Sequence, residues 1–504
     1  EEEEEESSFL SIKSIDLSHS TNSYQELKSC YAVLLATLAL DNDIIDIRIR
    51  SNPQIFNIKA RSIVQSNTIS TISYPYLNAG LTGSGEVIGV ADTGVDELSC
   101  FFVNTDKSLV ARSSFRNPTY DTTKRVVIQY VNYIAKYDGD IVNGHGTHVC
   151  GTVAGNVLSD GSYNGHGSGA KIAFFDMSTD SGEGIGYPIP LSTNVFAGAY
   201  SAGARIHSNS WGTSSNIYSD VSIDIDSYHL KKTDFLAIFA AGNEGAHGYY
   251  SVGTPALAKN SLAVGASYNA ALTTGNIEDI AYFSSIGPTV DNRIKPEIVA
   301  PGYLVKSAAS GEIGVETCSI LTLSGTSMAT PAVAGNAALI RRYYQNSQFW
   351  PTMCNKTYSS CKSFAPKGAT VKATIIHSGH QMEEYIGSGA TTEPTTQLSS
   401  TPDFFEGFGR ISLPNVLPYT GIETKIDLYV EELTMTSLQK ITYTVTVTDT
   451  TRPLKATIVW MDAVNTIISS KLLLNDIDLQ IIQLSTNTKY YGNNNPGDDI
   501  NNVE

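Results

Sequence analysis

Three segments far apart in the chain each carry one side chain that hydrolysis by a serine requires. Asp92 follows an apolar run, His145 lies in a glycine-rich segment, and Ser327 follows a glycine turn at the start of an apolar stretch. Taken singly, they have ordinary explanations as a turn residue, a core histidine and a helix cap. Taken together, they supply a nucleophile, a base and a carboxylate that fixes the tautomer of the base. They therefore predict a catalytic triad.

Two other chemistries fit these residues less well. His145 and His148 are spaced to share a helical face as metal ligands, but no third ligand with zinc-like spacing follows. We expect His145 to point into a cleft and His148 to be a buried structural histidine. The order Asp, His, Ser differs from that of α/β-hydrolases, and Ala329 breaks their Gly-x-Ser-x-Gly elbow, which excludes a lipase or esterase of that kind.

Short apolar runs that end in Gly, Asp or Asn alternate with stretches able to form helices over the middle of the chain. They are apolar on both faces, which is typical of buried parallel strands joined by helical crossovers. The runs are 87–90, 172–175, 236–241, 261–265 and 297–300. We expect an α/β core with the chemistry beyond the carboxyl ends of the strands.

The pattern changes after residues 407–410. Residues 441–447 alternate at period two, and 456–460 form another strand-like run after a turn at 451–453. These are signals of antiparallel strands. We predict a partial prosegment over 1–56 with a helical stretch around 25–40, a catalytic domain over 57–418, and an incomplete C-terminal antiparallel β-sandwich or jelly-roll-like domain over 419–504.

Composition bounds the class of protein. The 504 residues are 41% hydrophobic and 16% charged, which favours a large globular protein with more than one core. The net charge of −17 argues against nucleic acid as a partner. No run reaches the roughly 20 apolar residues of a membrane span. The chain opens on Glu1 and stops at Glu504, so we expect it to be a piece of a longer product.

With these motifs in place, the chain resembles the subtilisin-like serine proteases, or subtilases, over about 57–415. The likeness lies in Asp-Thr-Gly from Asp92, in Gly-His-Gly-Thr-His-Val-x-Gly from Gly144, and in Gly-Thr-Ser-Met-Ala-Thr-Pro from Gly325. It implies a doubly wound, mostly parallel sheet and a serine endopeptidase that forms an acyl-enzyme. It also implies that Asn243 is the side-chain donor to the oxyanion.

The resemblance further implies how a polypeptide substrate binds. Residues 207–212 are similar to the segment that pairs with an extended substrate as an added strand, and residues 182–186 are expected to form the facing strand. The residues implied in substrate binding are Ser210, Trp211, Gly212, Gly184, Ala241 and Gly242.

A closer likeness is to alkaline subtilases with a C-terminal β-barrel, seen in residues 200–212, 473–479 and 490–493. In that branch the β domain binds calcium, for which Asn475, Asp476 and Asp478 offer oxygen ligands. The alternative is a solvated turn. Residues 57–61 are similar to the start of mature enzymes of the branch. Cleavage near Phe56 would make the preceding residues an inhibitory prosegment of a zymogen.

Six cysteines are too few for a scaffold built of disulfides. Cys354 and Cys361 flank the N-glycosylation sequon Asn355-Lys356-Thr357 in a polar segment. One interpretation is a local disulfide in a glycoprotein that is secreted or otherwise extracytoplasmic. The other is two free thiols and an unused sequon.

Two alternatives to a free-standing protease remain open. One is a non-catalytic binding module that keeps the fold, although all four expected catalytic residues are present. The other is the peptidase part of a larger protein, such as a serine protease/ABC transporter fusion, a type in which similar domains occur.

Overall fold

The computed structural model describes residues 56–504, apart from 70, 135–138, 160, 180–183, 270–275, 355–360, 388–393, 420–425, 467–468 and 470. The chain divides into compact units at 1–54 and 55–504. The predicted helix around 25–40, nearly all of the predicted prosegment and the sequon lie outside the described residues.

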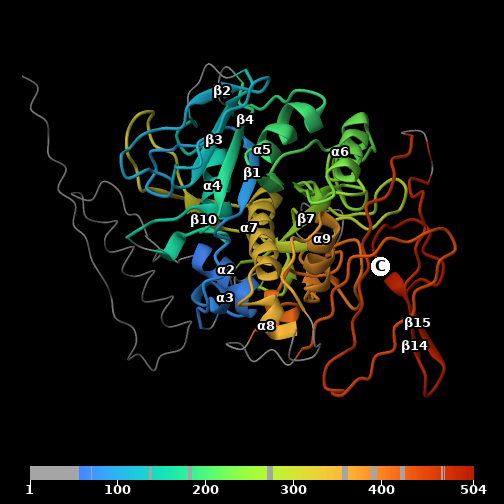
Figure 1. Ribbon diagram of the computed structural model, residues 1–504. Coiled ribbons are helices and arrows are strands. Elements are labelled where there is room, and N and C mark those ends of the chain that lie inside the picture. The colour runs from blue at the N-terminus through green and yellow to red at the C-terminus, as the bar shows by residue number, and fades with distance from the viewer. Residues whose placement is uncertain are drawn as a thin grey trace, which may run out of the picture. The chain divides into compact units, whose positions relative to one another are not determined.

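A mostly parallel sheet occupies the centre of the second unit (Figure 1). Its strands run in the order β13-β12-β8-β7-β6-β5-β1-β4-β3-β2, with β9 paired to β7. All five predicted strands are present, as β1 (Val87–Asp92), β4 (Lys171–Asp176), β6 (Leu236–Ala240), β7 (Leu262–Ser267) and β9 (Ile298–Pro301). The expected doubly wound α/β class is confirmed.

The sequence analysis did not single out the remaining strands of this sheet. These are β2 (Arg112–Ser114), β3 (Val127–Asn132), β5 (Ala204–Asn209), β8 (Asp279–Ile280), β12 (Glu384–Tyr385) and β13 (Thr396–Gln397). Strand β5 pairs in parallel with both β1 and β6. It contains Ser208 and Asn209, which are fully buried polar residues, so its apolar signal in the sequence is weak.

Helices cover both faces of the sheet, as alternation along the strands requires. Val90 and Ile238 lie in one core cluster with α4 (His145–Ala154) and α7 (Thr326–Gln345). Their neighbours Ala91 and Phe239 lie in a second cluster with α6 (Asp220–Lys231). Helix α5 (Ala197–Ser201) packs near β1, β4 and β5. The two core clusters therefore lie on opposite faces of one sheet.

The α4–α7 contact depends on small residues. A Cβ on Gly335 of α7 would lie 2.8 Å from the carbonyl oxygen of Val153 in α4 and 2.7 Å from Cβ of His166. A larger side chain at position 335 would separate the two helices. Because these helices carry His145 and Ser327 at their N-terminal ends, this close packing fixes the separation of the two residues.

The remaining regular elements lie around this core. They are the helices α2 (Phe56–Ser66), α3 (Pro75–Asn78), α8 (Trp350–Cys354) and α9 (Gly368–His377), and the hairpin of β10 (Val305–Ala308) and β11 (Ile320–Leu323). Among the described helices, none combines the length and apolar character that crossing a bilayer demands.

The C-terminal region contains antiparallel pairing, as predicted. Strands β14 (Gln480–Gln483) and β15 (Thr488–Tyr491) form a hairpin, and Val459 bridges antiparallel to Val503. The predicted strand over 441–447, however, is not assigned as one. Its side chains are mostly exposed, because no described strand pairs with it. The domain boundaries stay a prediction.

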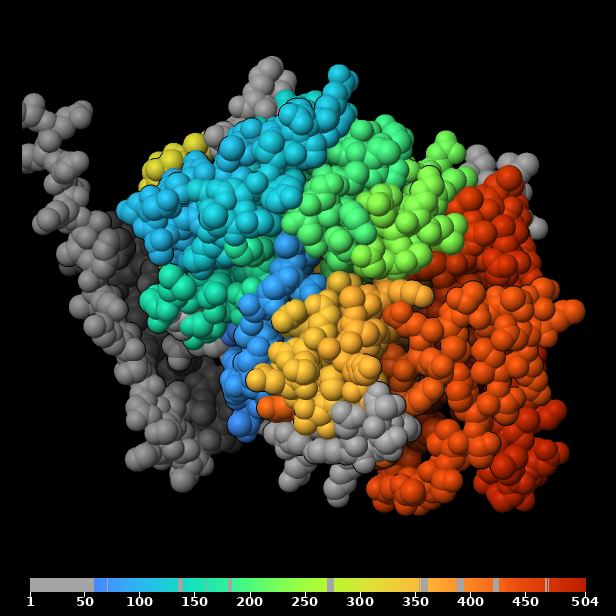
Figure 2. Space-filling view, in the orientation of Figure 1, coloured from blue at the N-terminus to red at the C-terminus, as the bar shows by residue number. Residues whose placement is uncertain are grey.

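The C-terminal region, orange to red in Figure 2, lies beside the green and yellow segments of the α/β core. A buried ion pair ties the two together. The ammonium of Lys259, just before β7, lies 2.5 Å from the Asp462 carboxylate, and both side chains are fully buried. Lys259 also donates to the carbonyls of Ala463 and Leu472. A buried charge is tolerated only with such partners. These contacts therefore hold Asp462, Ala463 and Leu472 against the core.

Two disulfides are present in the part of the chain that the structure describes. The predicted bond between Cys354 and Cys361 is confirmed. The second joins Cys100, beyond β1, to Cys318 in the loop before β11, across 218 residues of sequence. The sequence analysis missed it because nothing local links two cysteines so far apart. Cys150 in α4 is a free, buried thiol.

Candidate active site

Strand β1 delivers Asp92 to the carboxyl edge of the sheet, where it meets the first residue of α4. The Asp92 side chain is 2% exposed, and its Oδ1 accepts hydrogen bonds from Nδ1 of His145 at 2.7 Å and from the Thr93 amide at 2.8 Å. Nδ1 of His145 therefore carries the proton, and Nε2 is left as the basic nitrogen. The His145 side chain is 34% exposed, so one edge of the ring is open to solvent.

The charges around His145 set its basicity. Burial alone would lower its pKa, but the charge and hydrogen bond of Asp92, together with the charge of Asp140, raise the pKa above the ordinary histidine value. The protonated imidazolium is thus stabilised at this position. When it is neutral, this histidine can accept a proton from a neighbouring hydroxyl at Nε2, and its raised pKa helps it to hold that proton.

His148 is the buried structural histidine that the sequence predicts. It is fully buried, and its Nε2 lies 3.0 Å from the carbonyl oxygen of Val305. Burial lowers its pKa to about 3, so it is neutral.

Ser327 is the second residue of α7, and it forms a reciprocal pair with Ser210. The Ser327 hydroxyl donates to the Ser210 carbonyl at 3.0 Å, and the Ser210 hydroxyl donates to the Ser327 carbonyl at 2.8 Å. Among the described contacts, the Ser327 hydroxyl bonds to Ser210 and not to His145. Helix α7 therefore presents the hydroxyl at the sheet edge in a resting position.

Asn243 follows β6 and lies against the start of α7. Its Oδ1 accepts hydrogen bonds from the amide of Thr326 at 2.8 Å and from the Thr326 hydroxyl at 3.0 Å. Its amide nitrogen would be 3.4 Å from a Cβ on Gly325, and it has no protein partner among the described residues. Thr326 thus fixes the amide by its oxygen and leaves both N–H groups available.

The other residues implied in substrate binding lie on neighbouring segments. Trp211 is 7% exposed, and its side chain packs on the rings of Tyr187 and Phe239. Because the side chain is buried in this way, a substrate would contact the backbone of Trp211 more than its ring. A Cβ on Gly212 would meet the Thr254 carbonyl at 2.9 Å.

The Ala241 amide donates to the Val264 carbonyl, and the Gly242 amide donates to the Thr326 hydroxyl. The carbonyl of Gly184 accepts a hydrogen bond from the Thr179 amide, and the residues between them, 180–183, lie outside the described part of the chain. The substrate-binding role of these residues stays a prediction.

The sequence analysis did not single out two residues of the site, Asp140 and Thr93. Asp140 is 2% exposed, accepts hydrogen bonds from Thr93 and from the Thr147 amide, and its charge acts on His145. The available signals were a carboxylate shortly before His145 and a hydroxyl directly after Asp92. Neither spacing is distinctive without the fold.

The residues predicted to bind calcium lie in the loop before β14. The amide of Asn475 donates to the Asp462 carboxylate. Partial burial and the neighbouring charge of Asp478 raise the pKa of Asp476. Over the parts of the chain that the structure describes, no group of three or more His, Cys, Asp or Glu residues could hold a metal ion. Calcium binding stays a prediction.

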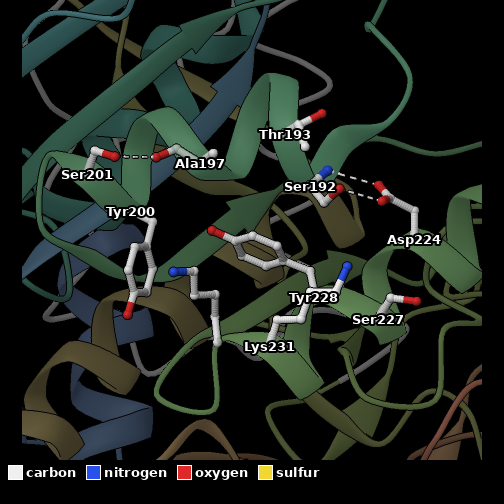
Figure 3. A pocket seen from close by; sticks show the side chains of 10 residues that line it. Ser192, Thr193, Ala197, Tyr200, Ser201, Asp224, Ser227, Tyr228 and Lys231 are labelled. Atoms are coloured by element: carbon white, nitrogen blue, oxygen red, sulfur yellow. Dashed lines mark hydrogen bonds between the residues drawn. The ribbon is translucent and has the colours of Figure 1, made fainter.

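A cavity of about 220 Å³ lies away from these residues, over α5 and α6 (Figure 3). Its walls include Tyr200, Tyr228, Lys231 and Asp224, the last hydrogen-bonded to Ser192. Nothing of the Asp92–His145 arrangement reaches it, and we assign it no part in the chemistry.

Comparison with known proteins agrees with this geometry. A sequence model of the subtilase family, peptidase family S8, matches residues 83–409, which include all the residues discussed around Asp92, His145 and Ser327.

Relatives of two kinds are similar to the chain. The serine protease/ABC transporter B family protein tagD of Dictyostelium discoideum is 27% identical over 84% of this chain and 30% of its own length. The chain thus spans less than a third of that relative. Subtilisin Savinase of Lederbergia lenta is 32% identical over 53% of this chain and 79% of its own length.

The fold is also similar to that of a solved protease. The Clostridium perfringens CspB protease matches with a TM-score of 0.50 at 16% identity, covering 72% of this chain and 96% of that one.

Proposed function

Because the chain belongs to the subtilase family of serine peptidases, we propose that it is an endopeptidase that cleaves peptide bonds through an acyl-enzyme on Ser327. The observation that carries the proposal is the 2.7 Å hydrogen bond between the buried carboxylate of Asp92 and Nδ1 of His145. It leaves Nε2 as the basic nitrogen of a side chain that is partly exposed to solvent. A histidine with a purely structural role would not need both a buried carboxylate on Nδ1 and a solvent-exposed edge.

In the proposed reaction, the Ser327 hydroxyl leaves the Ser210 carbonyl by rotation of its side chain and gives its proton to Nε2 of His145. The oxygen attacks the scissile carbonyl, and Asp92 stabilises the imidazolium that forms. His145 then returns the proton to the leaving amine. Water repeats the sequence on the acyl-enzyme and releases the second product. The hydrogen bond between a catalytic hydroxyl and its base commonly forms or shortens only when substrate binds.

The oxyanion of each tetrahedral intermediate would be held by Nδ2 of Asn243 and the Ser327 amide. Thr326 supports this role, since its two hydrogen bonds occupy the carbonyl side of the Asn243 amide. A preorganised donor stabilises the developing charge without reorganising.

We further infer that substrates are polypeptides bound in extended form along residues 210–212, with residues 184–186 on the other side. Residues 1–56 would be a cleaved prosegment that inhibits the enzyme. Two disulfides favour an oxidising, extracytoplasmic location.

A second proposal concerns the whole protein. Three relatives in Dictyostelium discoideum carry names of serine protease/ABC transporter proteins and match at most 30% of their own lengths. We propose that this chain is the peptidase part of such a fusion. Sequencing of the full-length transcript tests it, and a transcript without transporter sequence would contradict it.

The activity is tested with the purified 504-residue chain, a fluorophosphonate probe and a quenched peptide library. We expect probe labelling and peptide cleavage by the wild type, and neither by Ser327→Ala. The matched control is Ser324→Ala, an exposed serine on the same turn that accepts a hydrogen bond from the Leu304 amide. Cleavage that survives Ser327→Ala would overturn the nucleophile, and a wild type that resists the probe would favour a non-catalytic module.

A further inference from the structure

A second buried carboxylate, Asp140, lies behind the Asp92–His145 pair. Its Oδ1 accepts hydrogen bonds from the Thr93 hydroxyl at 3.0 Å and the Ile141 amide at 3.1 Å, and its Oδ2 accepts from the Thr147 amide at 2.8 Å. With 2% of its surface exposed, it is nearly as enclosed as a core residue. A buried carboxylate is costly, so its position calls for an explanation.

The first explanation is the start of α4. Helices begin with amides that lack an intrahelical acceptor, and here the N-cap residue is Gly144, which has no side chain to supply one. The Gly146 amide instead donates to the Thr93 hydroxyl at 3.0 Å, and the Thr147 amide donates to Asp140. Thr93 thereby links Asp140 to the first turn of α4, whose first residue is His145.

The backbone is shaped to hold this carboxylate. A Cβ on Gly144 would lie 2.1 Å from the carboxyl carbon of Asp140, and a Cβ on Gly94 would lie 2.0 Å from the Gly139 carbonyl. Both glycines therefore leave room for Asp140 and its loop. Gly94 also has a φ of +135°, which other residues rarely adopt.

The second explanation is charge. Burial raises the pKa of Asp140 to about 7, against the hydrogen bonds from Thr147 and Thr93 that lower it, and the charge of Asp92 adds to the rise. Asp140 in turn raises the pKa of His145. The titratable groups that face this carboxylate or its two partners are Asp92, His145, His148, Cys150 and Tyr130. Asp140 therefore gains its negative charge in the same range of pH in which His145 becomes neutral.

We propose that Asp140 is a positioning residue of this protease: through Thr93 and the Thr147 amide it holds the first turn of α4, and its negative charge supports the imidazolium that His145 becomes during catalysis. This proposal rests on the proposed function. Asp140 does not touch substrate, and it acts only through His145 and Thr93.

The test uses Asp140→Asn in the full chain and measures the second-order rate of fluorophosphonate labelling of Ser327 from pH 5 to pH 9. The labelling rate should fall on the acid side of the pH profile, which is the acid limb. Loss of the Asp140 charge should move this limb to lower pH by roughly half a unit to one unit, since one nearby charge shifts the pKa of a group by about this much. The rate on the alkaline plateau should fall by about 10-fold or more, because small misplacements of a catalytic group have large effects.

Two variants separate the roles. Thr93→Val removes the bridging hydroxyl but no charge, so it should lower the plateau without moving the limb. Asp96→Asn is the control for the charge, because Asp96 lies shortly after Thr93 and its carboxylate is partly buried. That carboxylate accepts hydrogen bonds from the amides of Leu98 and Gly311, and its charge does not act on His145. Its acid limb should stay in place.

An acid limb unchanged in Asp140→Asn, with the variant folded by its near-UV circular dichroism, would overturn the charge role. A limb that shifts equally in Asp96→Asn would also overturn it. An unchanged plateau would overturn the positioning role. These results differ from failure of the proposed function, in which the wild type itself is not labelled and Ser327→Ala has no effect.

Discussion

The hydroxyl of Ser210 donates a 2.8 Å hydrogen bond to the backbone carbonyl of Ser327, the one carbonyl of α7 that Pro331 leaves without its helical donor. Proline has no amide hydrogen, so the bond from position 331 to position 327 cannot form. Ser210 replaces it from the end of β5. The proline therefore frees the carbonyl at position 327, and the bond from Ser210 to this carbonyl fixes the turn that carries Ser327, the proposed nucleophile, to the sheet.

We expect Ser210→Ala to lower the free energy of unfolding by about 1 to 2 kcal/mol, since it leaves that carbonyl without a partner. Urea unfolding of the two proteins measures the difference. The control is Ser222→Ala, because the Ser222 hydroxyl is buried and has no hydrogen-bond partner among the residues that the structure describes. If both variants lose the same free energy of unfolding, the hydrogen bond from Ser210 to the Ser327 carbonyl does not stabilise the protein.

The pH dependence of cleavage follows from the raised pKa of His145. The base works only when neutral, and Asp92 and Asp140 hold its proton more tightly than in a free histidine, against the opposing effect of burial. Activity should therefore fall as the pH drops through a midpoint above the ordinary value of about 6.5. A pH profile of kcat/KM measures this. A midpoint well below 6 would contradict the balance of charges around His145.

The orientation of Asn243 is expected to depend on Thr326. We predict that Asn243→Ala lowers kcat by about 100- to 1000-fold with little change in KM, as for loss of one oxyanion donor. Thr326→Val removes one of the two hydrogen bonds that the Asn243 Oδ1 accepts, and it should lower kcat by roughly 10-fold.

Thr330→Val is the matched control for Thr326→Val. It removes a hydroxyl one turn later in α7, which bonds to the Thr326 carbonyl and not to Asn243. Its kcat should stay near that of the wild type. A larger loss in Thr330→Val than in Thr326→Val would refute the support of Asn243 by Thr326.

The two disulfides should differ in their contribution to stability. The bond between Cys100 and Cys318 closes 218 residues, and that between Cys354 and Cys361 closes 7. Restriction of the unfolded chain predicts a loss of roughly 5 kcal/mol for Cys100→Ser with Cys318→Ser, against roughly 2 kcal/mol for the other pair. Thermal denaturation of both double variants tests the order. The reverse order would show that native contacts, and not loop closure, dominate.

The parallel sheet could be predicted because its central strands are buried on both faces and are therefore apolar throughout, as in 236–241 and 87–90. Strand β5 was not, because Ser208 and Asn209 are buried with hydrogen-bond partners or close packing that only the folded sheet provides. The strand expected over 441–447 shows the converse. Alternation in sequence predicts a face for burial, but a strand also needs a partner strand.

The sequence by itself determined the family of this chain and the residues proposed for its chemistry. Asp92, His145, Ser327 and Asn243 are identified by side-chain type and by the small residues around them, which depend on local sequence alone. The tertiary structure decided how these groups are held. The bond from Ser210 to Ser327, the carboxylate of Asp140 under α4, and the disulfide from Cys100 to Cys318 all join residues distant in sequence. Such contacts leave no local pattern, because they arise only when separate strands and helices pack together.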